Sequence, residues 1–396
     1  MTSKIEVSEI NESNYVSTEN MLSNKGGITI ASSLPDTKSV RKYLPQDILI
    51  NNIRPYFKKI WYSDMIGGCS NDVFVIRSKE NYDSKFLYYV LSSDDFFSYV
   101  MANAKGTKMP RGDKKAIQNY EVPNFSIDEQ KRISFVLSEI DKKIEVNKMI
   151  NKNLEELMHV LFKKYFIDNN PFYVENDEKW NIIKLKDLII RNRDKINDFD
   201  NWKDELLIDL SNMPRFSIAI SNFDKGKKFT SNIYKLNKYD LLFGSIRPYF
   251  GKVGFSPING VVTGTVHSFK PIDDIYYSLV LSLISSKTFI NYTVSVSKGT
   301  KMPSVKWDDF INYEFAIPDD LSKIGEYNKI LLPLIHKIEK NILEIQRLTK
   351  LRDTLLPKLM SGEIDVSKIN CDLELKYNYM KYLFNQIHTP MSKSVV

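Results

Sequence analysis

DILINNIRPYFKKI at residues 47–60 and DLLFGSIRPYFGKV at residues 240–253 decide the fold of this 396-residue chain. Both contain Ile-Arg-Pro-Tyr-Phe, and Arg247 follows Arg54 at a spacing of 193 positions (247 − 54 = 193). Separated blocks that keep one register indicate an internal repeat, so the chain uses one fold twice. Two further blocks recur at this spacing without a gap: Lys-Gly-Thr-Lys-Met-Pro at 105–110 and 298–303, and Asn-Tyr-Glu at 119–121 and 312–314.

Each copy combines short β-rich runs with one apolar helical segment. The periodicity predicts strands and one helix per copy, which makes an α+β protein of two similar α/β domains, each with a small sheet. The predicted strands include 48–53 and 72–76 in the first copy and 241–246 and 261–269 in the second, and the predicted helices span 86–101 and 276–290.

A long amphipathic helix follows each copy. After Pro123, Ser126 and Glu129 have the spacing of a capping box that starts the first helix. Apolar residues then recur at alternating spacings of four and three, which is the heptad pattern. The first seam consists of Ile133, Leu137, Ile140, Ile144, Asn147, Asn151, Leu154, Met158 and Leu161, and the second of Ile335, Ile338, Ile342, Ile345, Thr349, Arg352, Leu356 and Leu359.

Both seams carry a polar interruption, at Asn147 and Asn151 in the first and at Thr349 and Arg352 in the second. Because a lone helix with such a seam has an unsatisfied face, we expect the two helices to pair as an antiparallel coiled coil. The polar layers would set its register, and the two domains would lie at opposite ends of the rod. The alternative is that each helix packs on its own domain.

The predicted order is a first domain at 1–125, a first helix at 126–168, a second domain at 169–320, a second helix at 321–362 and a C-terminal extension at 363–396. The sequence assigns no structure to this extension.

The amino-acid composition limits the kinds of function that the chain could have. A formal charge of +7 is consistent with a polyanionic partner, but it is a small excess of 56 basic over 49 acidic residues. Two cysteines and four scattered histidines predict neither a disulfide scaffold nor a zinc site. The longest apolar stretch, 275–284, is too short to span a bilayer, so we expect a cytoplasmic protein without a membrane partner.

No catalytic motif is complete. There is no phosphate-binding Gly-x-x-x-x-Gly-Lys-Ser/Thr loop and no Gly-x-Gly-x-x-Gly. Asn170-Pro171-Phe172 has only one proline of an amino-methyltransferase signature and is interpreted as a turn. Asp47 and Asp240 each precede a strand, where an aspartate most often caps a turn. We therefore expect no catalytic residue and no metal site.

Repeated cations are the candidates for contact with a phosphate backbone. The proline after Arg54 and Arg247 is expected to hold both arginines in extended backbone, and the glycines of the Lys-Gly-Thr loops let backbone approach a phosphate closely. A structural arginine or a tight structural turn is the alternative in each case. The candidates are Arg54, Lys59, Lys105, Lys108, Arg247, Lys252, Lys298 and Lys301.

If the two copies recognise different nucleic-acid sequences, residues that are identical in both copies cannot account for the difference in recognition. Base readers should then lie where the copies diverge: 23–42 against 214–228, 67–71 against 260–264, and 111–115 against 304–308. The polar members able to address base edges are Arg41, Lys42, Asn71, Arg111, Arg215, Asn222, Lys227, Lys228 and Lys306. Taken singly, each of them is more readily a solvated surface residue than a base contact.

The order of these motifs resembles the specificity subunit of type I restriction-modification systems. Its elements are the Asp-Ile-Leu…Ile-Arg-Pro strands, the Lys-Gly-Thr loop, and Pro123, Glu129-Gln130, Ile133 and Leu137 leading into the helix. Residues 15–21 (YVSTENM) resemble the opening of that family's first target-recognition domain, and residues 355–364 (LLPKLMSGEI) the end of its second helix. The resemblance covers about residues 5–366.

This resemblance implies a DNA-binding subunit without catalysis of its own, in which each domain reads one half of a bipartite target and the helices act as a ruler. It also implies partners: double-stranded DNA, two methyltransferase subunits and restriction subunits. S-adenosylmethionine, ATP and Mg²⁺ would be used by those partner subunits and not be bound by this chain. The complex would be a DNA adenine-N6 methyltransferase and an ATP-dependent endonuclease.

The ruler interpretation is consistent with helix length. From Ile133 to Leu161 a helix rises by about 42 Å at about 1.5 Å per residue, comparable with the roughly 34 to 36 Å between half-sites one duplex turn apart. Two other classes remain open: the recognition part of a fused restriction-methylation enzyme, and a coiled-coil interaction scaffold.

The chain departs from the family pattern in three places. The first copy has no counterpart to residues 180–185, which open the second copy, and the second helix has Glu326-Tyr327 in place of the Glu-Gln pair. Residues 370–396 extend past the usual end.

Overall fold

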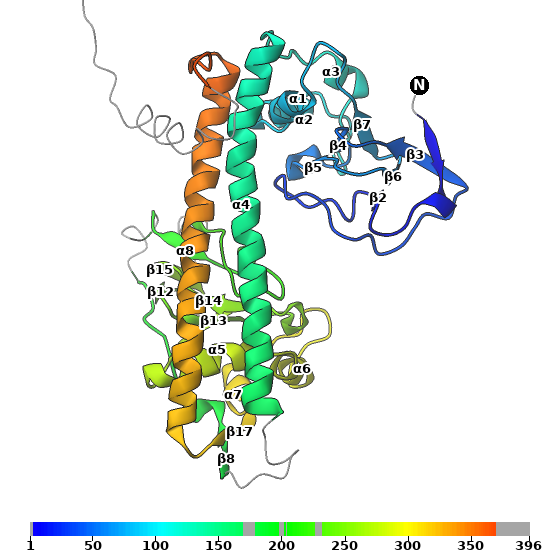
Figure 1. Cartoon of the computed structure of the whole chain (residues 1–396). Coiled ribbons are helices and arrows are strands. Elements are labelled where there is room, and N and C mark those ends of the chain that lie inside the picture. Colours follow the sequence, from blue (N-terminus) through cyan, green and yellow to red (C-terminus); the bar gives the residue numbers. More distant parts are fainter. Residues whose placement is uncertain (1–2, 169–178, 198–201, 203, 226–231, 370–396) are drawn as a thin grey trace, which may run out of the picture. The chain divides into compact units, whose positions relative to one another are not determined.

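Figure 1 shows the computed structural model, which describes residues 3–168, 179–197, 202, 204–225 and 232–369. The chain divides into two compact units, with 1–141 and 351–396 in unit 1 and 142–350 in unit 2. Each unit holds one copy of the repeat and a stretch of both long helices, α4 (Ile127–Phe162) and α8 (Leu321–Met360).

Unit 1 contains a four-stranded sheet in the order β1-β3-β6-β2 and a three-stranded sheet in the order β5-β4-β7. Its strands are β1 (Lys4–Glu6), β2 (Tyr15–Val16), β3 (Ser39–Tyr43), β4 (Ile48–Asn51), β5 (Ile60–Tyr62), β6 (Gly67–Cys69) and β7 (Val73–Ile76), and its short helices are α1 (Ser84–Leu91), α2 (Asp94–Ala102) and α3 (Lys114–Gln118).

Unit 2 contains sheets in the orders β11-β10-β15-β12, β14-β13-β16-β9 and β17-β8. Its strands are β8 (Trp180–Lys184), β9 (Ile189–Arg191), β10 (Leu206–Ile208), β11 (Asp224–Lys225), β12 (Ile233–Leu236), β13 (Leu241–Gly244), β14 (Val253–Phe255), β15 (Gly260–Thr263), β16 (Val266–Pro271) and β17 (Glu314–Pro318), and its short helices are α5 (Tyr277–Ser285), α6 (Lys287–Ser295) and α7 (Trp307–Ile311).

The two units share the central strand pairings of their two main sheets. The buried strand β4 pairs antiparallel with β5 and β7, as β13 does with β14 and β16. In the other sheet, β6 has a parallel neighbour, β2, and an antiparallel neighbour, β3, as β15 has β10 and β12. The predicted α+β class is confirmed, and the sequence repeat is a repeat of structure.

The apolar segment predicted as one helix is two helices in each unit, so that prediction was wrong. Ser93 and Ser286 cap α2 and α6, because each hydroxyl accepts from a backbone N–H three residues on, at 3.1 and 3.2 Å. Serine favours such a cap over a helix interior, where its side chain competes for backbone hydrogen bonds. The run 261–269 is likewise two strands, β15 and β16, which belong to different sheets.

The start of α4 is the predicted capping box. The backbone N–H of Ser126 donates to Glu129 Oε2 at 2.9 Å, and the N–H of Glu129 donates to Ser126 Oγ at 3.3 Å. The predicted turn caps are also present, since Asp47 Oδ2 accepts from the N–H of Leu44 and Asp240 Oδ2 from that of Asn237, at 2.7 and 2.8 Å.

The amide of Gln130 has a structural counterpart in unit 2. In unit 1, Gln130 Oε1 accepts from the N–H of Asp83 at 2.9 Å, just before α1. In unit 2, Asn328 Oδ1 accepts from Ser278 Oγ at 2.6 Å, in the first turn of α5. An amide side chain near the start of each long helix therefore fixes the domain in front of it.

The long helices pair antiparallel within each unit, as predicted. In unit 1, Arg352 Nη1 donates to Asp141 Oδ1 at 2.9 Å. In unit 2, Asn147 Nδ2 donates to Glu344 Oε2 at 2.9 Å, and Asn341 Nδ2 to Asn151 Oδ1 at 2.8 Å. The predicted seam residues are buried except for the half-buried Leu154, Leu161, Thr349 and Arg352; the buried ones are Ile133, Leu137, Ile140, Ile144, Asn147, Asn151, Met158, Ile335, Ile338, Ile342, Ile345, Leu356 and Leu359.

The opening strand of the second copy, β8, pairs antiparallel with β17. Residues 121–125 of unit 1, which correspond to β17 in the repeat, are not a strand. Pro123, which has no backbone N–H to donate, lies in this segment. Within the part of the chain that the structure describes, no helix is long and apolar enough to cross a membrane.

Candidate nucleic-acid interface

The shared Arg-Pro-Tyr-Phe stretch is a tight turn in each unit, with a 3-10 helix at Pro55–Phe57 and at Pro248–Phe250. Arg54 and Arg247, in front of it, both have φ 51°, in the left-handed region. The prediction that proline holds them in extended backbone was therefore wrong. The reason is a tertiary contact, because the N–H of each arginine donates to Pro110 O or Pro303 O, at 2.8 and 2.7 Å.

Those two prolines end the Lys-Gly-Thr-Lys-Met-Pro loops. Lys105 exchanges two backbone hydrogen bonds of 2.9 Å with Arg111, and Lys298 exchanges two of 3.0 Å with Ser304, so each loop closes as a small hairpin. Gly106 at φ 90° provides the left-handed residue that the loop of unit 1 needs. The two repeated motifs thus lie together in each unit, and we call residues 54–57 with 105–110, and 247–250 with 298–303, the turn–loop pair.

Each turn–loop pair exposes the same kinds of side chain. Tyr56 and Met109 are exposed in unit 1, and Tyr249 and Met302 in unit 2. The cations Arg54, Lys105, Lys108, Lys298 and Lys301 are exposed as well, and Lys105 forms an ion pair with Asp113 at 2.6 Å. A cationic, partly apolar surface of one composition is therefore presented once by each unit.

Arg247 is half-buried, and its Nε atom is buried without a hydrogen-bond partner among the described residues. Such orphaned donors are rare in folded proteins, because burial removes their water without replacement. A phosphate oxygen at the turn would satisfy this donor.

Two of the lysines predicted to contact phosphate form hydrogen bonds within their own domain. Lys59 Nζ donates to Thr18 O at 2.6 Å, and Lys252 Nζ donates to Leu210 O. Burial lowers the pKa of both ammonium groups. These lysines connect the turn to the neighbouring segment of the domain, which makes them part of the scaffold.

In each unit, a segment whose sequence differs between the two copies is hydrogen-bonded to the end of the Arg-Pro-Tyr-Phe turn. In unit 1, the N–H of Lys25 donates to Lys58 O at 2.9 Å, and in unit 2 the N–H of Phe216 donates to Gly251 O at 3.0 Å. Since Lys58 and Gly251 are equivalent in the repeat, residues 22–28 and 214–221 are equivalent segments, and we call each the divergent loop of its unit.

The divergent loop of unit 2 presents Arg215 and Phe216 at the surface. The Arg215 guanidinium lies 3.8 Å from the centre of the Phe250 ring, and the Phe216 side chain is 64% exposed. A guanidinium stacked on an aromatic ring keeps its N–H edge free to meet an acceptor. Arg215 is thus displayed next to the turn–loop pair.

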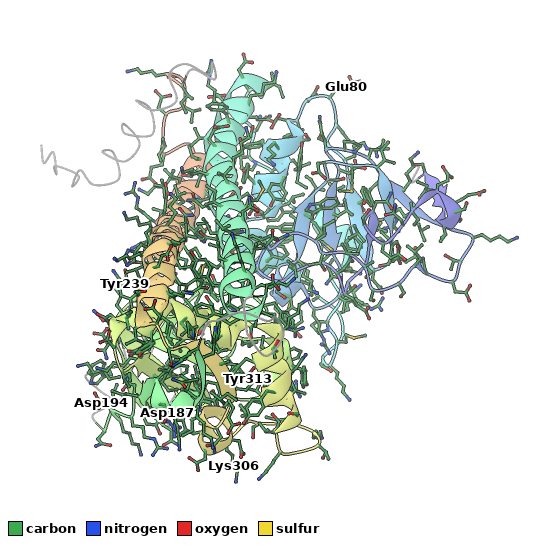
Figure 2. The ribbon with its side chains drawn as sticks, turned by 60° about the horizontal axis from the view of Figure 1, so that its bottom comes forward. Glu80, Asp187, Asp194, Tyr239, Lys306 and Tyr313 are labelled. Carbon is green, nitrogen blue, oxygen red and sulfur yellow. The ribbon has the colours of Figure 1, made fainter. Side chains whose placement is uncertain are left out.

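The other predicted base readers are dispersed. Arg41 on β3 donates to Val73 O at 2.6 Å, and Arg111 forms an ion pair with Asp72 at 3.1 Å. The remaining members lie at or near the surface, except for Lys227 and Lys228, which are outside the described residues: Lys42 is half-buried, and Asn71, Asn222 and Lys306 are exposed, with Lys306 visible at the surface of unit 2 in Figure 2.

Two residues important to this surface were not predicted. Glu155 on α4 and Gln346 on α8 both bind the divergent loop of unit 2. Each lies beside the hydrophobic seam, Glu155 next to Leu154 and Gln346 next to Ile345, where a polar residue normally faces solvent. A heptad pattern alone therefore gives no signal for them. Among the described residues, no group of three or more His, Cys, Asp or Glu is placed to hold a metal ion.

The chain is similar to known proteins. Residues 3–156 match the family model described as type I restriction modification DNA specificity domain. The specificity subunit of type I restriction enzyme MjaIX from Methanocaldococcus jannaschii is 28% identical over 320 residues, which are 74% of this chain and 72% of the relative. The MjaVIII specificity subunit of the same organism is 24% identical over 324 residues, 73% and 72% of the two chains.

A solved structure shares the fold. The S subunit of a type I restriction-modification system from M. genitalium superposes with a TM-score of 0.53 at 15% identity, over 91% of this chain and 96% of that one.

Proposed function

We propose that the chain is a specificity subunit of a type I restriction-modification system, which binds double-stranded DNA and directs such a complex to a bipartite target. The match of residues 3–156 to the specificity-domain family and the similarity to two specificity subunits support this proposal. The observation that carries this proposal is the duplicated turn–loop pair, with one divergent loop seated on each copy. Identical scaffolds with different loops are suited to reading two different half-sites, one per unit.

The shared cations would hold the DNA backbone. Arg54 and Lys108 in unit 1, with Arg247 and Lys301 in unit 2, occupy the two turn–loop pairs, and Lys298 adds a cation in unit 2. Contacts from such groups to phosphate fix orientation and register without reading sequence. The exposed residues of the divergent loops, Arg215 above all, would then address base edges, since a guanidinium can bind guanine in two places.

The long helices would fix the spacing of the half-sites. α4 is continuous over 36 residues, which corresponds to about 54 Å at about 1.5 Å per residue. The polar pairs Asn147–Glu344 and Asn151–Asn341 oppose a slip of one helix against the other, because a slip would leave the buried amides of Asn147, Asn151 and Asn341 without these partners. A fixed register gives a fixed gap in the DNA target.

In this proposal the chain is a non-catalytic subunit, and the chemistry would belong to its partners. We propose that methyltransferase subunits, using S-adenosylmethionine, modify adenine N6 at the target and that restriction subunits use ATP and Mg²⁺. The matches to specificity subunits along most of the chain support this division of labour.

Mapping of N6-methyladenine tests the proposal. The chain is co-expressed with its methyltransferase subunit in a host without adenine methylation, and methylated sites are located by single-molecule sequencing. We expect one bipartite motif with a fixed gap, and exchange of the divergent loop of one unit should change only one half of it. A motif without a gap, or no methylation above that of the methyltransferase alone, would contradict the proposal.

Two controls separate the other classes. Methylation or cleavage of DNA by the purified chain alone would indicate an enzyme. Negligible DNA affinity that does not respond to salt, even with the methyltransferase present, would indicate an interaction scaffold, because phosphate binding weakens steeply as salt rises.

A further inference from the structure

The divergent loop of unit 2 is bound to α4 by a buried carboxylate. Glu155 is only 8% exposed. Its Oε1 accepts from Ser217 Oγ at 2.8 Å, and its Oε2 accepts from the backbone N–H of Ile218 at 3.2 Å. Both donors follow Arg215 and Phe216 directly, so the carboxylate holds the exposed tip of this loop from behind.

The second long helix binds the other end of the same loop. Gln346 Nε2 donates to Ser221 O at 3.1 Å. Between the two attachments, Ile218 and Ile220 are buried. The turn holds the loop on its other side through the hydrogen bond from Phe216 to Gly251. The path of residues 216–221 is therefore defined by both long helices as well as by the domain itself.

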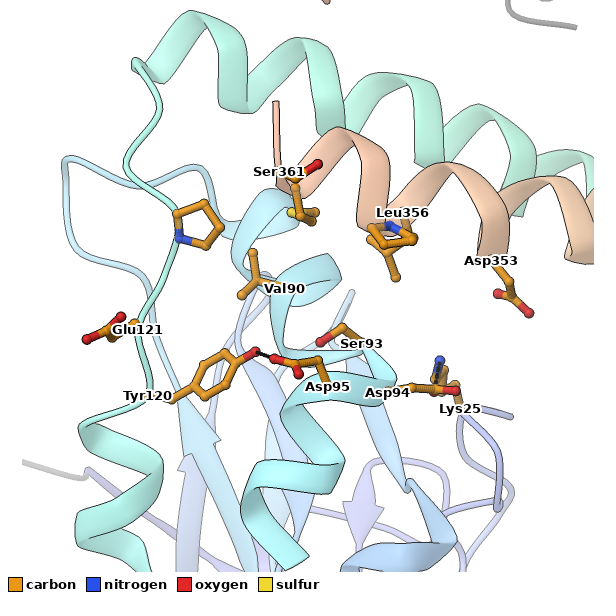
Figure 3. Close-up of a pocket in the computed structure, with 13 residues that line it drawn as sticks. Lys25, Val90, Ser93, Asp94, Asp95, Tyr120, Glu121, Asp353, Leu356 and Ser361 are labelled. Carbon is orange, nitrogen blue, oxygen red and sulfur yellow. Dashed lines mark hydrogen bonds and ion pairs between the residues drawn. The ribbon is translucent and has the colours of Figure 1, made fainter. Parts of the chain in front are cut away.

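Unit 1 lacks this arrangement at the equivalent place. The seams of α4 and α8 align at a spacing of 198, as in Leu137 and Ile335, which makes Asp353 the counterpart of Glu155. Asp353 Oδ1 accepts from Arg352 Nη2 at 2.9 Å. It lines a groove of about 450 Å³ together with Lys25 of the divergent loop, as Figure 3 shows.

The divergent loop of unit 1 is held within its own domain instead. Lys25 Nζ forms an ion pair with Asp94 of α2 at 3.1 Å, and Lys58 Nζ meets the same carboxylate at 3.0 Å. The two loops thus occupy equivalent positions on equivalent turns. A buried side chain of a long helix, Glu155, binds the loop of unit 2.

We propose that Glu155 and Gln346 are positioning residues for the half-site read by unit 2, because they hold the loop that displays Arg215 and Phe216. The inference rests on the proposed function, since it concerns how one half-site is read. It gives two residues of the long helices a role in specificity. Without it, these helices would only fix the distance between the two half-sites.

The test uses the complex reconstituted with the methyltransferase subunit and DNA duplexes in which one half-site at a time is altered. Glu155→Ala removes the acceptor and should reduce discrimination at the unit 2 half-site by about tenfold or more, as expected for the loss of hydrogen bonds to a charged group. Discrimination at the other half-site should be unchanged. Gln346→Ala should act in the same direction.

Glu155→Gln is the informative conservative variant. Its amide oxygen can accept from the N–H of Ile218 while its Nε2 donates to Ser217 Oγ, so it should retain discrimination. Glu156→Ala is the matched control, because Glu156 is the exposed neighbour on the same helix. Hydrogen exchange of the free complex gives a readout without DNA, in which Glu155→Ala should raise exchange at residues 217–219 only.

The outcomes are distinct. Folded Glu155→Ala protein that discriminates as the parent does at both half-sites, or that loses both equally, overturns the proposal. Should this variant not fold, Ser217→Ala removes one of the bonds from the loop side and must show a smaller loss at the same half-site. If the parent complex itself shows no half-site preference, the proposed function fails and the inference fails with it.

Discussion

Asn151 of α4 and Asn341 of α8 meet inside the helix pair of unit 2, where Asn341 Nδ2 donates to Asn151 Oδ1 at 2.8 Å. Both side chains are almost fully buried, and Asn341 Oδ1 is without a hydrogen-bond partner among the described residues. The pair is therefore incompletely satisfied, and its contribution lies in register more than in stability.

Asn341→Leu should destabilise unit 2, because it leaves Asn151 buried without its donor, at a cost of about 1–3 kcal/mol. Replacing both asparagines by leucine should recover this loss and raise Tm above the parent value, since no polar group then remains in the layer. Thermal unfolding of the two variants measures this. Equal Tm values for the single and the double variant would show that the two amides do not interact.

The stability of unit 2 should fall as pH rises from about 4.5 to 7. Burial raises the pKa of Glu155 to about 7, whereas an unfolded glutamate titrates near about 4.3. The folded state therefore binds more protons than the unfolded state in this window, and the added stability is lost as Glu155 ionises.

Urea unfolding at pH 5 and pH 8 isolates this contribution. Glu155→Gln, which cannot ionise, should be more stable than the parent at pH 8 by up to about 4 kcal/mol, because the shift from about 4.3 to about 7 is nearly three pKa units. Glu156→Gln is the exposed control and should follow the parent at both pH values. A parent and a Glu155→Gln protein with the same pH dependence would rule out Glu155 as the titrating group.

The polar layer of unit 1 is an ion pair extended by a phenol. Asp141 accepts from Arg352 Nη1 at 2.9 Å and from Tyr89 Oη at 2.7 Å. Asp141→Ala should lower the free energy of unfolding of unit 1 by about 1–3 kcal/mol, less than for a fully buried pair, because both partners retain some access to water.

Denaturant unfolding measures the effect of Asp141→Ala, with Lys131→Ala as an exposed control on α4 of unit 1 that should stay within about 0.5 kcal/mol of the parent. An effect no larger than that of the control would mean that the layer adds nothing to stability.

Lys108→Ala and Lys301→Ala should each reduce the slope of log affinity against log salt by about one, without changing the preferred DNA sequence. Both lysines belong to the turn–loop pairs and are exposed. Lys59→Ala should instead reduce stability, because Lys59 Nζ bonds Thr18 O inside the domain. Binding titrations at several salt concentrations, with Tm as the second measurement, separate the two effects. A changed target motif in Lys108→Ala would show that this residue reads bases.

The repeat, the helix seams and the capping box were predictable because each is a local or periodic property. Heptad spacing needs only the positions of the apolar residues, and Ser126 and Glu129 act within one helical turn. The shared motifs predicted a shared fold for the same reason, since identical residues at one spacing require no knowledge of tertiary contacts.

The remaining features depend on contacts distant in sequence. Arg54 is left-handed because its N–H donates to Pro110 O, and Lys59 is half-buried, with its Nζ bonded to Thr18 O. Asn341 was missing from the predicted polar layer, because it lies one position before the seam residue Ile342 and becomes buried only through its contact with Asn151. Glu155 shows the same limit, since a glutamate on a helix flank gives no sign of the loop that it binds.

The partition of the chain also has a consequence for synthesis. Unit 2 is one uninterrupted stretch, 142–350, whereas unit 1 needs residues that follow it, among them Arg352 and the buried Leu355 and Leu356. During translation at about 5–20 residues per second, domains ordinarily fold in order from the N-terminus. Here the first copy to be made is the last to be completed. Until the end of α8 has been synthesised, the apolar seam of α4 in unit 1 lacks the residues that cover it in the complete chain.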